Sequence, residues 1–239
     1  MRYIPLFVII LLFCGCYNLK KHEIGKKEQV EQLAQKMWNA AGQDKWAETN
    51  LITFNFVLGN RYEVWDKERD YVYVKWKDNE VWLNMTSMKG IAKEDGELLS
   101  DKERDKLLKK AYNIWINDSY WLNPVAKIYD KGVERSMVDY KGDTTFLVHY
   151  TEGGNTPGDR YLWILNEDGL PKAWRLWVSV VPIKGVKFTW DNWITTETGV
   201  KISTLHKSSL MDIKVDQVHT AKRWSDLFES DPFDQLINL

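Results

Sequence analysis

The chain has 239 residues, with 33 Lys and Arg side chains against 34 Asp and Glu side chains and a formal net charge of −1 at pH 7. This balance rules out a strong electrostatic case for nucleic-acid binding. A chain of this length can bury roughly 70% of its unfolded surface, so one substantial domain with its own core is feasible.

The N-terminus has the layout of a secretory signal. Arg2 is followed by an apolar stretch from Ile4 to Phe13, which is shorter than the roughly 20 apolar residues that cross a bilayer. The stretch ends at Cys14-Gly15-Cys16. This pattern resembles the bacterial lipoprotein signal, in which a small residue precedes the modified cysteine, and Gly15 before Cys16 fits. The alternatives are an ordinary signal peptide and an uncleaved anchor.

The resemblance implies a signal peptide over residues 1–15 and acyl chains on Cys16. Residues 16–27 are polar and lysine-rich, as in a lipidated tether, and residues 28–239 follow as a single domain. Because Cys14 leaves with the signal and Cys16 is acylated, we expect no disulfide. Tyr17 and Asn18 replace the aspartate that marks inner-membrane retention in some bacteria. We therefore expect an outer-membrane location, on either the periplasmic or the surface face.

The first half predicts one helix and then four strands. Apolar residues from Val30 to Ala41 recur at helical spacing within a helix over 28–41, which Gly42 ends. Period-two alternation then predicts strands over 52–58, 61–66, 71–78 and 80–88. Their short connections favour an antiparallel meander.

A second helix starts at Ser100, where Glu103 completes a capping box, and we expect it to end near Asp118. We expect the aromatic segment 119–124 to be a turn that packs into the core. Strands follow, separated by turns, over 133–140, 145–151, 159–165, 170–181, 186–195, 200–206 and 211–218. The predicted fold class is α+β: a strongly curved antiparallel sheet, a half-open β-barrel of about 10–11 strands, with two main helices on its concave side.

Aromatic residues are abundant, with 13 tryptophans, most of them in predicted strands. One interpretation is that large rings line an apolar cavity for a lipid or similar ligand. The other is that they fill the core of a curved sheet or form cross-strand pairs. The candidate ligand-binding residues are Phe54, Phe56, Tyr73, Trp82, Trp115, Trp121, Trp174 and Trp190.

Several short motifs resemble a family. They are Ala40-Ala41-Gly42, Trp46, the segments 52–56 and 65–66, and later 117–124 and 156–161. In this order they look like uncharacterised outer-membrane lipoproteins of Bacteroidetes-type bacteria, which are similar in architecture to the LolA/LolB-type lipoprotein carriers. The resemblance implies a half-open barrel that holds acyl chains under a helical lid.

Signatures of catalysis are sparse. The four histidines, His22, His149, His206 and His219, lack a metal-ligand spacing. Asp66 with Asp70, and Asp191 between two tryptophans, are carboxylates of the kind that act on sugars, but no opposing partner can be placed. We expect no enzyme activity, no cofactor and no metal.

The leading hypothesis is a non-enzymatic envelope lipoprotein, a monomer that contacts the membrane through its acyl chains and binds a lipid or other apolar small molecule, but no nucleic acid. One alternative is a scaffold subunit of an outer-membrane assembly that uses exposed tryptophans as anchors. The other is a glycan-acting protein.

Overall fold

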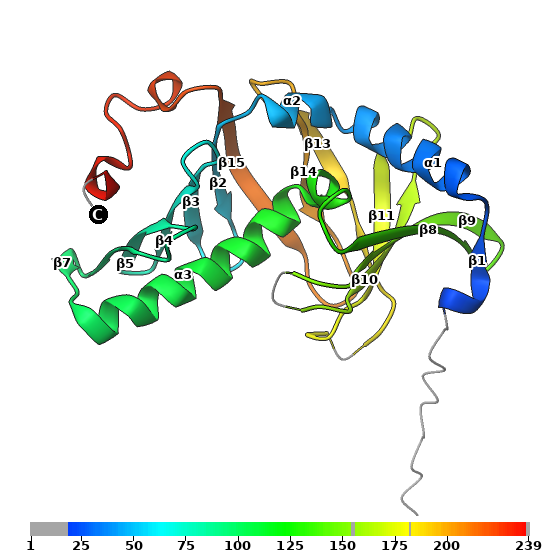
Figure 1. The fold of residues 1–239 in the computed structure, drawn as a ribbon, viewed down its shortest axis with the longest axis horizontal. Coiled ribbons are helices and arrows are strands. Elements are labelled where there is room, and N and C mark those ends of the chain that lie inside the picture. Colours follow the sequence, from blue (N-terminus) through cyan, green and yellow to red (C-terminus); the bar gives the residue numbers. More distant parts are fainter. Residues whose placement is uncertain (1–18, 154–155, 182, 238–239) are drawn as a thin grey trace, which may run out of the picture.

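The computed structural model describes residues 19–153, 156–181 and 183–237. Its strands form two antiparallel sheets that curve around a shared interior without closing into a barrel (Figure 1). This architecture confirms the predicted α+β class of a half-open barrel with helices. Cys16 and the signal lie outside the described residues, so the acylation stays a prediction.

The six-stranded sheet has the order β1-β8-β9-β10-β11-β12. Its strands are β1 (Glu23–Ile24), β8 (Val133–Tyr140), β9 (Asp143–Tyr150), β10 (Arg160–Leu165), β11 (Pro171–Trp177) and β12 (Val186–Thr189). The nine-stranded sheet has the order β13-β14-β15-β2-β3-β4-β5-β6-β7. Its strands are β2 (Leu51–Phe56), β3 (Arg61–Asp66), β4 (Tyr71–Trp76), β5 (Asn79–Asn84), β6 (Gly90–Glu94), β7 (Glu97–Leu98), β13 (Asp191–Thr195), β14 (Lys201–His206) and β15 (Ile213–Ala221).

The two sheets meet at Trp190, where the sequence predicts one continuous strand over 186–195. The amide of Thr189 donates to the carbonyl of Lys207 (2.9 Å), just beyond β14, whereas the amide of Trp190 donates to Lys172 of β11 (2.9 Å). Two consecutive amides therefore bond to different sheets, and the predicted strand is divided into β12 and β13. With the short strands β1, β6 and β7, which the sequence does not predict, this division accounts for the larger number of strands.

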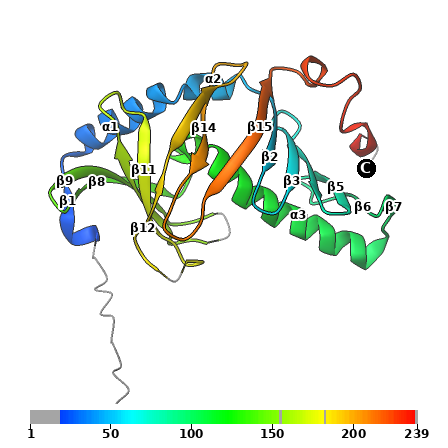
Figure 2. The same cartoon turned by 180° about the vertical axis from the view of Figure 1, so that it is seen from behind.

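Three α-helices occur in the described residues: α1 (Lys27–Ala40), α2 (Gln43–Ala47) and α3 (Asp101–Leu122). The first buries Val30, Ala34 and Met37 on one stripe and packs against β8 and β9. The third crosses β4, β5 and β6, and its C-terminal end reaches β14 and the 3₁₀ helix η2 (Pro124–Lys127) (Figures 1 and 2). No helix in the described part of the chain is long and apolar enough to cross a membrane.

The end of α3 corrects the prediction of a turn over 119–124. The helix continues through Leu122, and the residue that precedes Pro124 ends it, because proline disfavours a helical conformation in its predecessor. Tyr120 and Trp121 therefore belong to the last helical turn, and both pack against the main core. The expectation that this segment packs into the core holds, but through a helix.

The C-terminal segment covers a face of the nine-stranded sheet that the sequence leaves unassigned. It contains η3 (Trp224–Asp226) and η4 (Asp234–Leu236). Phe233 and Leu236 pack on this face with Val64 and Trp82. In β4, Val72 and Val74 point to the opposite face, where they pack with residues of α3. The strands β3 to β5 are thus buried on both faces, which explains why their sequences are apolar on both sides.

At the N-terminus, residues that the sequence assigns to the tether pack onto the six-stranded sheet. The 3₁₀ helix η1 (Leu19–His22) contacts β8, and Glu23 of β1 pairs with Val138. Leu19 is buried with Val138, Leu147 and Leu162 on the face of the sheet away from α1. The folded domain therefore begins by residue 19, close to Cys16 in the sequence.

Candidate functional site

The eight residues predicted to bind a ligand fall into two groups separated by the nine-stranded sheet. Six lie on the concave side: Phe54, Phe56, Trp121, Trp174 and Trp190 belong to the main core, and Trp115 of α3 packs beside it against Trp65. Tyr73 and Trp82 lie on the opposite, outer face. The structure therefore does not bring all eight residues together in one cavity.

On the concave side, the rings contact one another around Trp174. Its ring centroid lies 4.9 Å from that of Trp163, 4.9 Å from Trp190 and 5.1 Å from Trp121. Trp174 has no exposed surface. The pairs with Trp190 and Trp121 are edge-to-face, and such pairs contribute about 0.5–1.5 kcal/mol each beyond the burial of area. This aromatic interior is a packed core, as the second interpretation of the tryptophans predicts.

On the outer face, Tyr73 and Trp82 support the C-terminal segment. Their ring centroids are 4.8 Å apart, and Trp82 Nε1 donates to the carbonyl of Pro232 (3.1 Å). The hydroxyl of Tyr73 donates to Glu80 Oε1 (2.8 Å), and burial, followed by this carboxylate, raises the pKa of Tyr73. These contacts are structural, and a ligand in the half-barrel would not reach them.

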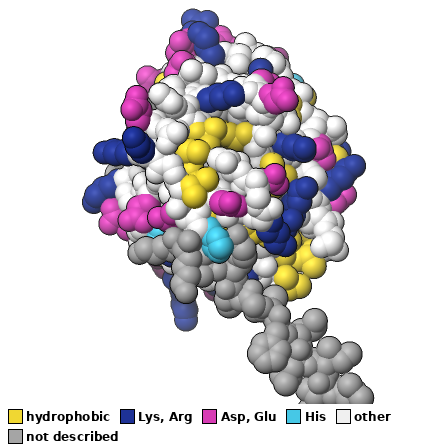
Figure 3. Space-filling model, turned by 90° about the vertical axis from the view of Figure 1, so that its right-hand side faces the viewer, with side chains coloured by type: hydrophobic (Ala, Val, Ile, Leu, Met, Phe, Trp, Pro, Cys, Tyr) yellow, Lys and Arg dark blue, Asp and Glu magenta, His cyan; other side chains and the backbone are white. Residues whose placement is uncertain are grey.

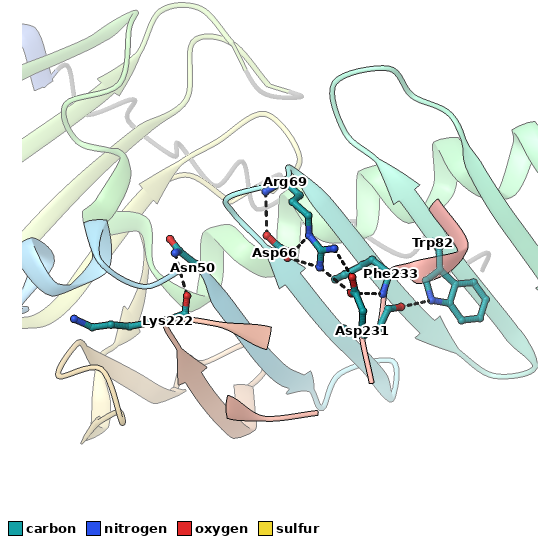
Figure 4. A network of polar contacts seen from close by, with 8 residues as sticks. Asn50, Asp66, Arg69, Trp82, Lys222, Asp231 and Phe233 are labelled. Carbon is teal, nitrogen blue, oxygen red and sulfur yellow. Dashed lines mark hydrogen bonds and ion pairs between the residues drawn. The ribbon is translucent and has the colours of Figure 1, made fainter. Parts of the chain in front are cut away.

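A guanidinium clamp holds the same segment in place. Arg69 contacts Asp66 through Nε (2.8 Å) and Asp231 through Nη2 (2.8 Å) (Figure 4). Asp231 also accepts a hydrogen bond from the amide of Phe233 (2.9 Å). The hydrogen bond from Arg69 is the main cause that lowers the pKa of Asp231. The clamp thus fixes the segment where Phe233 enters the core.

Two buried carboxyl groups, those of Glu63 in β3 and Asp118 in α3, lie close together at positions that the sequence does not single out. Arg61 forms a bidentate ion pair with Asp118, through Nε to Oδ2 (2.5 Å) and Nη2 to Oδ1 (2.8 Å). The Asp118 side chain has no exposed surface. Glu63 is fully buried, and its carboxyl group faces the carboxylate of Asp118.

The environment of Glu63 favours its neutral form. Burial is the main cause that raises the pKa of Glu63 well above its usual range, and the nearby Asp118 carboxylate raises it further, against the opposing effect of Arg61. An ionised carboxylate would be costly in such an environment, so burial favours the neutral carboxylic acid form of Glu63.

Above this pair, an open groove of about 460 Å³ runs between β3 and α3. Four cationic side chains line it, together with the apolar side chain of Ile114 and the carboxylate of Asp118. The cations are Arg61, Lys106, Lys109 and Lys110. Because Arg61 is paired with Asp118, the three lysines leave the groove with a positive charge. We call it the α3 groove.

The carboxyl groups beside the groove are engaged within the protein. Asp118 is held in two hydrogen bonds by Arg61, and Glu63 is shielded from solvent, so neither carboxyl is presented to a substrate. The other carboxylates that the sequence suggests are also engaged. Asp66 binds Arg69, Asp70 accepts from Thr86 (2.6 Å), and Asp191 accepts from Thr189 (2.6 Å).

The histidines are dispersed. Burial lowers the pKa of His206 to about 4, so this ring is neutral and packs against Trp190, at 4.3 Å between ring centroids. His149 and His219 contact Glu134 and Glu197, respectively, in separate strands. Within residues 19–153, 156–181 and 183–237, no group of three or more His, Cys, Asp or Glu side chains is placed to hold a metal ion.

The sequence contains a weak signal for the buried acid. Arg61, Glu63 and Trp65 alternate with Tyr62 and Val64 in β3, so Glu63 shares a face with Trp65. Because a large aromatic ring such as Trp65 usually faces a protein core, this shared face predicts that Glu63 also points inward. Its partner Asp118 lies 55 positions later at the end of a helix, and sequence spacing does not predict their contact.

Comparison with known proteins finds structural neighbours but no matching sequence. No family model and no curated protein matches the chain. The chain is similar in structure to a crystal structure of a DUF1329 family protein from Desulfovibrio piger, a family without an assigned function, with 10% sequence identity and a TM-score of 0.40. The match covers 83% of this chain and 99% of that chain. At this level of similarity, the comparison carries no argument about function.

Proposed function

We propose that the protein is a non-enzymatic lipoprotein of the bacterial envelope, anchored in the outer membrane through Cys16, and that its half-barrel binds an anionic amphiphile at the α3 groove. The observation that carries this proposal is the composition of the groove. Three lysines and an arginine surround one opening that also has an apolar wall at Ile114. Cationic side chains bind phosphate or carboxylate headgroups, and the apolar wall suits the adjoining part of a lipid.

The groove supports ligand binding better than the aromatic interior does. A ligand in the interior would have to separate rings that are in contact with one another, such as Trp174 and Trp190. The α3 groove is already open. We therefore place the apolar or lipid ligand at the edge of the half-barrel, next to the helix that covers it.

The acidic pair below the groove supports this assignment. Arg61 lies between the groove and the buried Glu63, and its guanidinium is oriented by Asp118 and by the ring of Phe56, 4.7 Å from the ring centroid. If Glu63 were ionised, it would cancel part of the positive charge. Its raised pKa favours the neutral form, which adds no negative charge below the groove.

The scaffold alternative required exposed tryptophans. All 13 tryptophans lie in the described residues, and each is buried or half-buried. Partly buried rings offer less surface to a partner protein, so we favour lipid binding over a scaffold role.

The test has two independent measurements on protein purified from bacterial membranes. The intact mass reports acylation, which we expect to disappear in Cys16→Ser. Binding of a fluorescent lysophosphatidylglycerol reports the groove, and we expect Lys106→Glu combined with Lys109→Glu to weaken it at least tenfold. The matched control is Lys102→Glu, an exposed change on the same helix outside the groove. Equal weakening in both variants would refute the groove, and an unmodified Cys16 would refute the anchor.

A further inference from the structure

Exposed apolar side chains gather in three turns at one edge of the molecule. The β2–β3 turn carries Val57 and Leu58, which are 45% and 48% exposed. The β11–β12 loop carries Val180 and Ile183, and the β14–β15 loop carries Leu210 and Met211, all exposed by about half or more of their surface. We call this set the apolar rim: Val57, Leu58, Val180, Ile183, Leu210 and Met211.

The topology makes the three turns neighbours. The β14–β15 loop leads into β15, and Val57 donates its amide to Lys214 of that strand (3.0 Å). On its other side, the same loop shares a groove of about 410 Å³ with the β11–β12 loop. Ser208 fixes the loop, because its hydroxyl oxygen accepts from the amides of Leu210 (3.1 Å) and Met211 (3.0 Å).

Cationic side chains accompany the rim. The shared groove is lined by Arg175, Lys184, Lys187 and Lys207, and no acidic residue lines it. Exposed Asp212 follows in the same loop, whereas the neighbouring Asp159 is buried and accepts from the amide of Ser179 (2.8 Å). Figure 3 views the molecule from its right-hand end in Figure 1, and hydrophobic side chains lie beside Lys and Arg side chains in the lower right of that view.

The start of the folded domain lies beside the same loops. Trp177, the last residue of β11, packs against the cluster that contains Leu19, and it also lies beside Gly185 in the β11–β12 loop. Cys16 is three residues before Leu19 in the sequence, a separation that an extended chain spans in about 11 Å at most. An acyl chain on Cys16 would therefore enter the membrane next to the rim.

We propose that the apolar rim and the adjacent lysines form a membrane-docking surface that lies on an anionic bilayer. The apolar side chains enter the interface, and Lys187 and Lys207 contact anionic headgroups. The proposed anchor at Cys16 brings this surface to the membrane, so the inference rests on the proposed function. Docking fixes the orientation of the domain, which a flexible tether alone would leave free.

The experiment uses the acylated protein reconstituted in vesicles that contain phosphatidylglycerol. Val180→Cys and Leu210→Cys each carry an environment-sensitive fluorophore, and a brominated lipid serves as the quencher. The control is Lys222→Cys, an exposed site at the far end of β15, about 30 Å from the rim along the strand. We expect quenching at positions 180 and 210 that is several-fold greater than at position 222.

A charge test follows from the same geometry. Lys187→Gln and Lys207→Gln should each lower the ratio of docked to undocked protein about fivefold on anionic vesicles. If fluorophores at positions 180 and 210 of the acylated protein are not quenched by the brominated lipid, the docking surface is refuted while the anchor at Cys16 stands. Energy transfer between rim labels of two copies, without lipid quenching, would assign the surface to a dimer and also overturn it. A mass without acyl chains would overturn the anchor together with this inference.

Discussion

The ion pair between Arg61 and Asp118 offers a test of how strongly α3 is tied to the nine-stranded sheet. In Arg61→Leu, the carboxylate of Asp118 loses both of its hydrogen bonds to the guanidinium and stays without exposed surface. Asp118 would keep the hydrogen bond that it accepts from Asn117 (2.7 Å), and the buried carboxyl group of Glu63 lies nearby. The variant therefore leaves an uncompensated charge between a helix and a sheet.

Breaking a buried ion pair by removing one partner costs about 3–5 kcal/mol. For a domain of roughly 200 residues, each kcal/mol corresponds to about 2–4 °C in the melting temperature, so we expect a decrease of roughly 10 °C. Because Arg61 is only 18% exposed, solvent cannot replace most of its interaction. The midpoint of thermal unfolding, followed by circular dichroism, measures this shift.

The control is the double variant Arg61→Leu with Asp118→Leu. Replacing both members of a buried pair by apolar residues is often neutral or stabilising, so the double variant should recover most of the lost stability. A decrease of less than about 2 °C in Arg61→Leu would refute the reasoning, since it would mean that solvent reaches the Asp118 carboxylate. Equal losses in the single and double variants would indicate a packing effect of Arg61 against Phe56.

Three further predictions concern the buried acid, the clamp and the aromatic interior. Because the pKa of Glu63 is raised in the folded state, the free energy of unfolding should fall as the pH rises above the ordinary carboxyl pKa near 4.5. Glu63→Gln should flatten this dependence in unfolding series from pH 5 to 8. Identical pH dependences for the variant and the unmodified protein would contradict this prediction. Asp231 has a lowered pKa, so its stabilisation is present at neutral pH and is lost as the pH falls through that pKa. Asp231→Asn should release the C-terminal segment to limited proteolysis at pH 7, and unchanged cleavage would count against the clamp. Trp174→Ala should cost about 3–5 kcal/mol in urea unfolding, because the cavity lies in a packed core, whereas a loss below about 1 kcal/mol would indicate a pre-existing cavity.

Much of the fold can be predicted from the sequence where a periodic pattern dominates. The helix predicted over 28–41 occurs as α1 (Lys27–Ala40), and the strand pattern over 61–66 gives the observed bounds of β3. The alternating hydrophobic pattern does not predict a strand where the strand contains small or charged residues. In β6, Gly90 lies so close to the neighbouring strand that a Cβ atom there would be 2.1 Å from the carbonyl oxygen of Trp82. A glycine required by this close approach breaks the strand pattern.

The candidate site could not be predicted to the same extent, because its parts come from distant segments. Arg61 and Asp118 meet only when α3 lies across the sheet, and the neutral form of Glu63 depends on that burial. Likewise, Tyr73 and Trp82 were grouped with the interior rings because a strand pattern does not specify which side faces the concavity. The C-terminal segment that covers them has no periodic pattern of its own.

The net charge of −1 is an average that conceals how the charges are arranged. Eight cationic side chains line two grooves, the α3 groove and the groove beside the apolar rim, whereas Asp118 is the one acidic residue among their lining residues. Each groove is about 400–500 Å³, which is comparable to a small-molecule pocket. Recognition of a nucleic acid requires a continuous basic track along many phosphates, whereas two separate grooves with apolar neighbours fit the single headgroups of anionic lipids. The near-neutral composition and the proposed lipid contacts are therefore compatible, because Asp118 alone among the residues that line the two grooves is acidic.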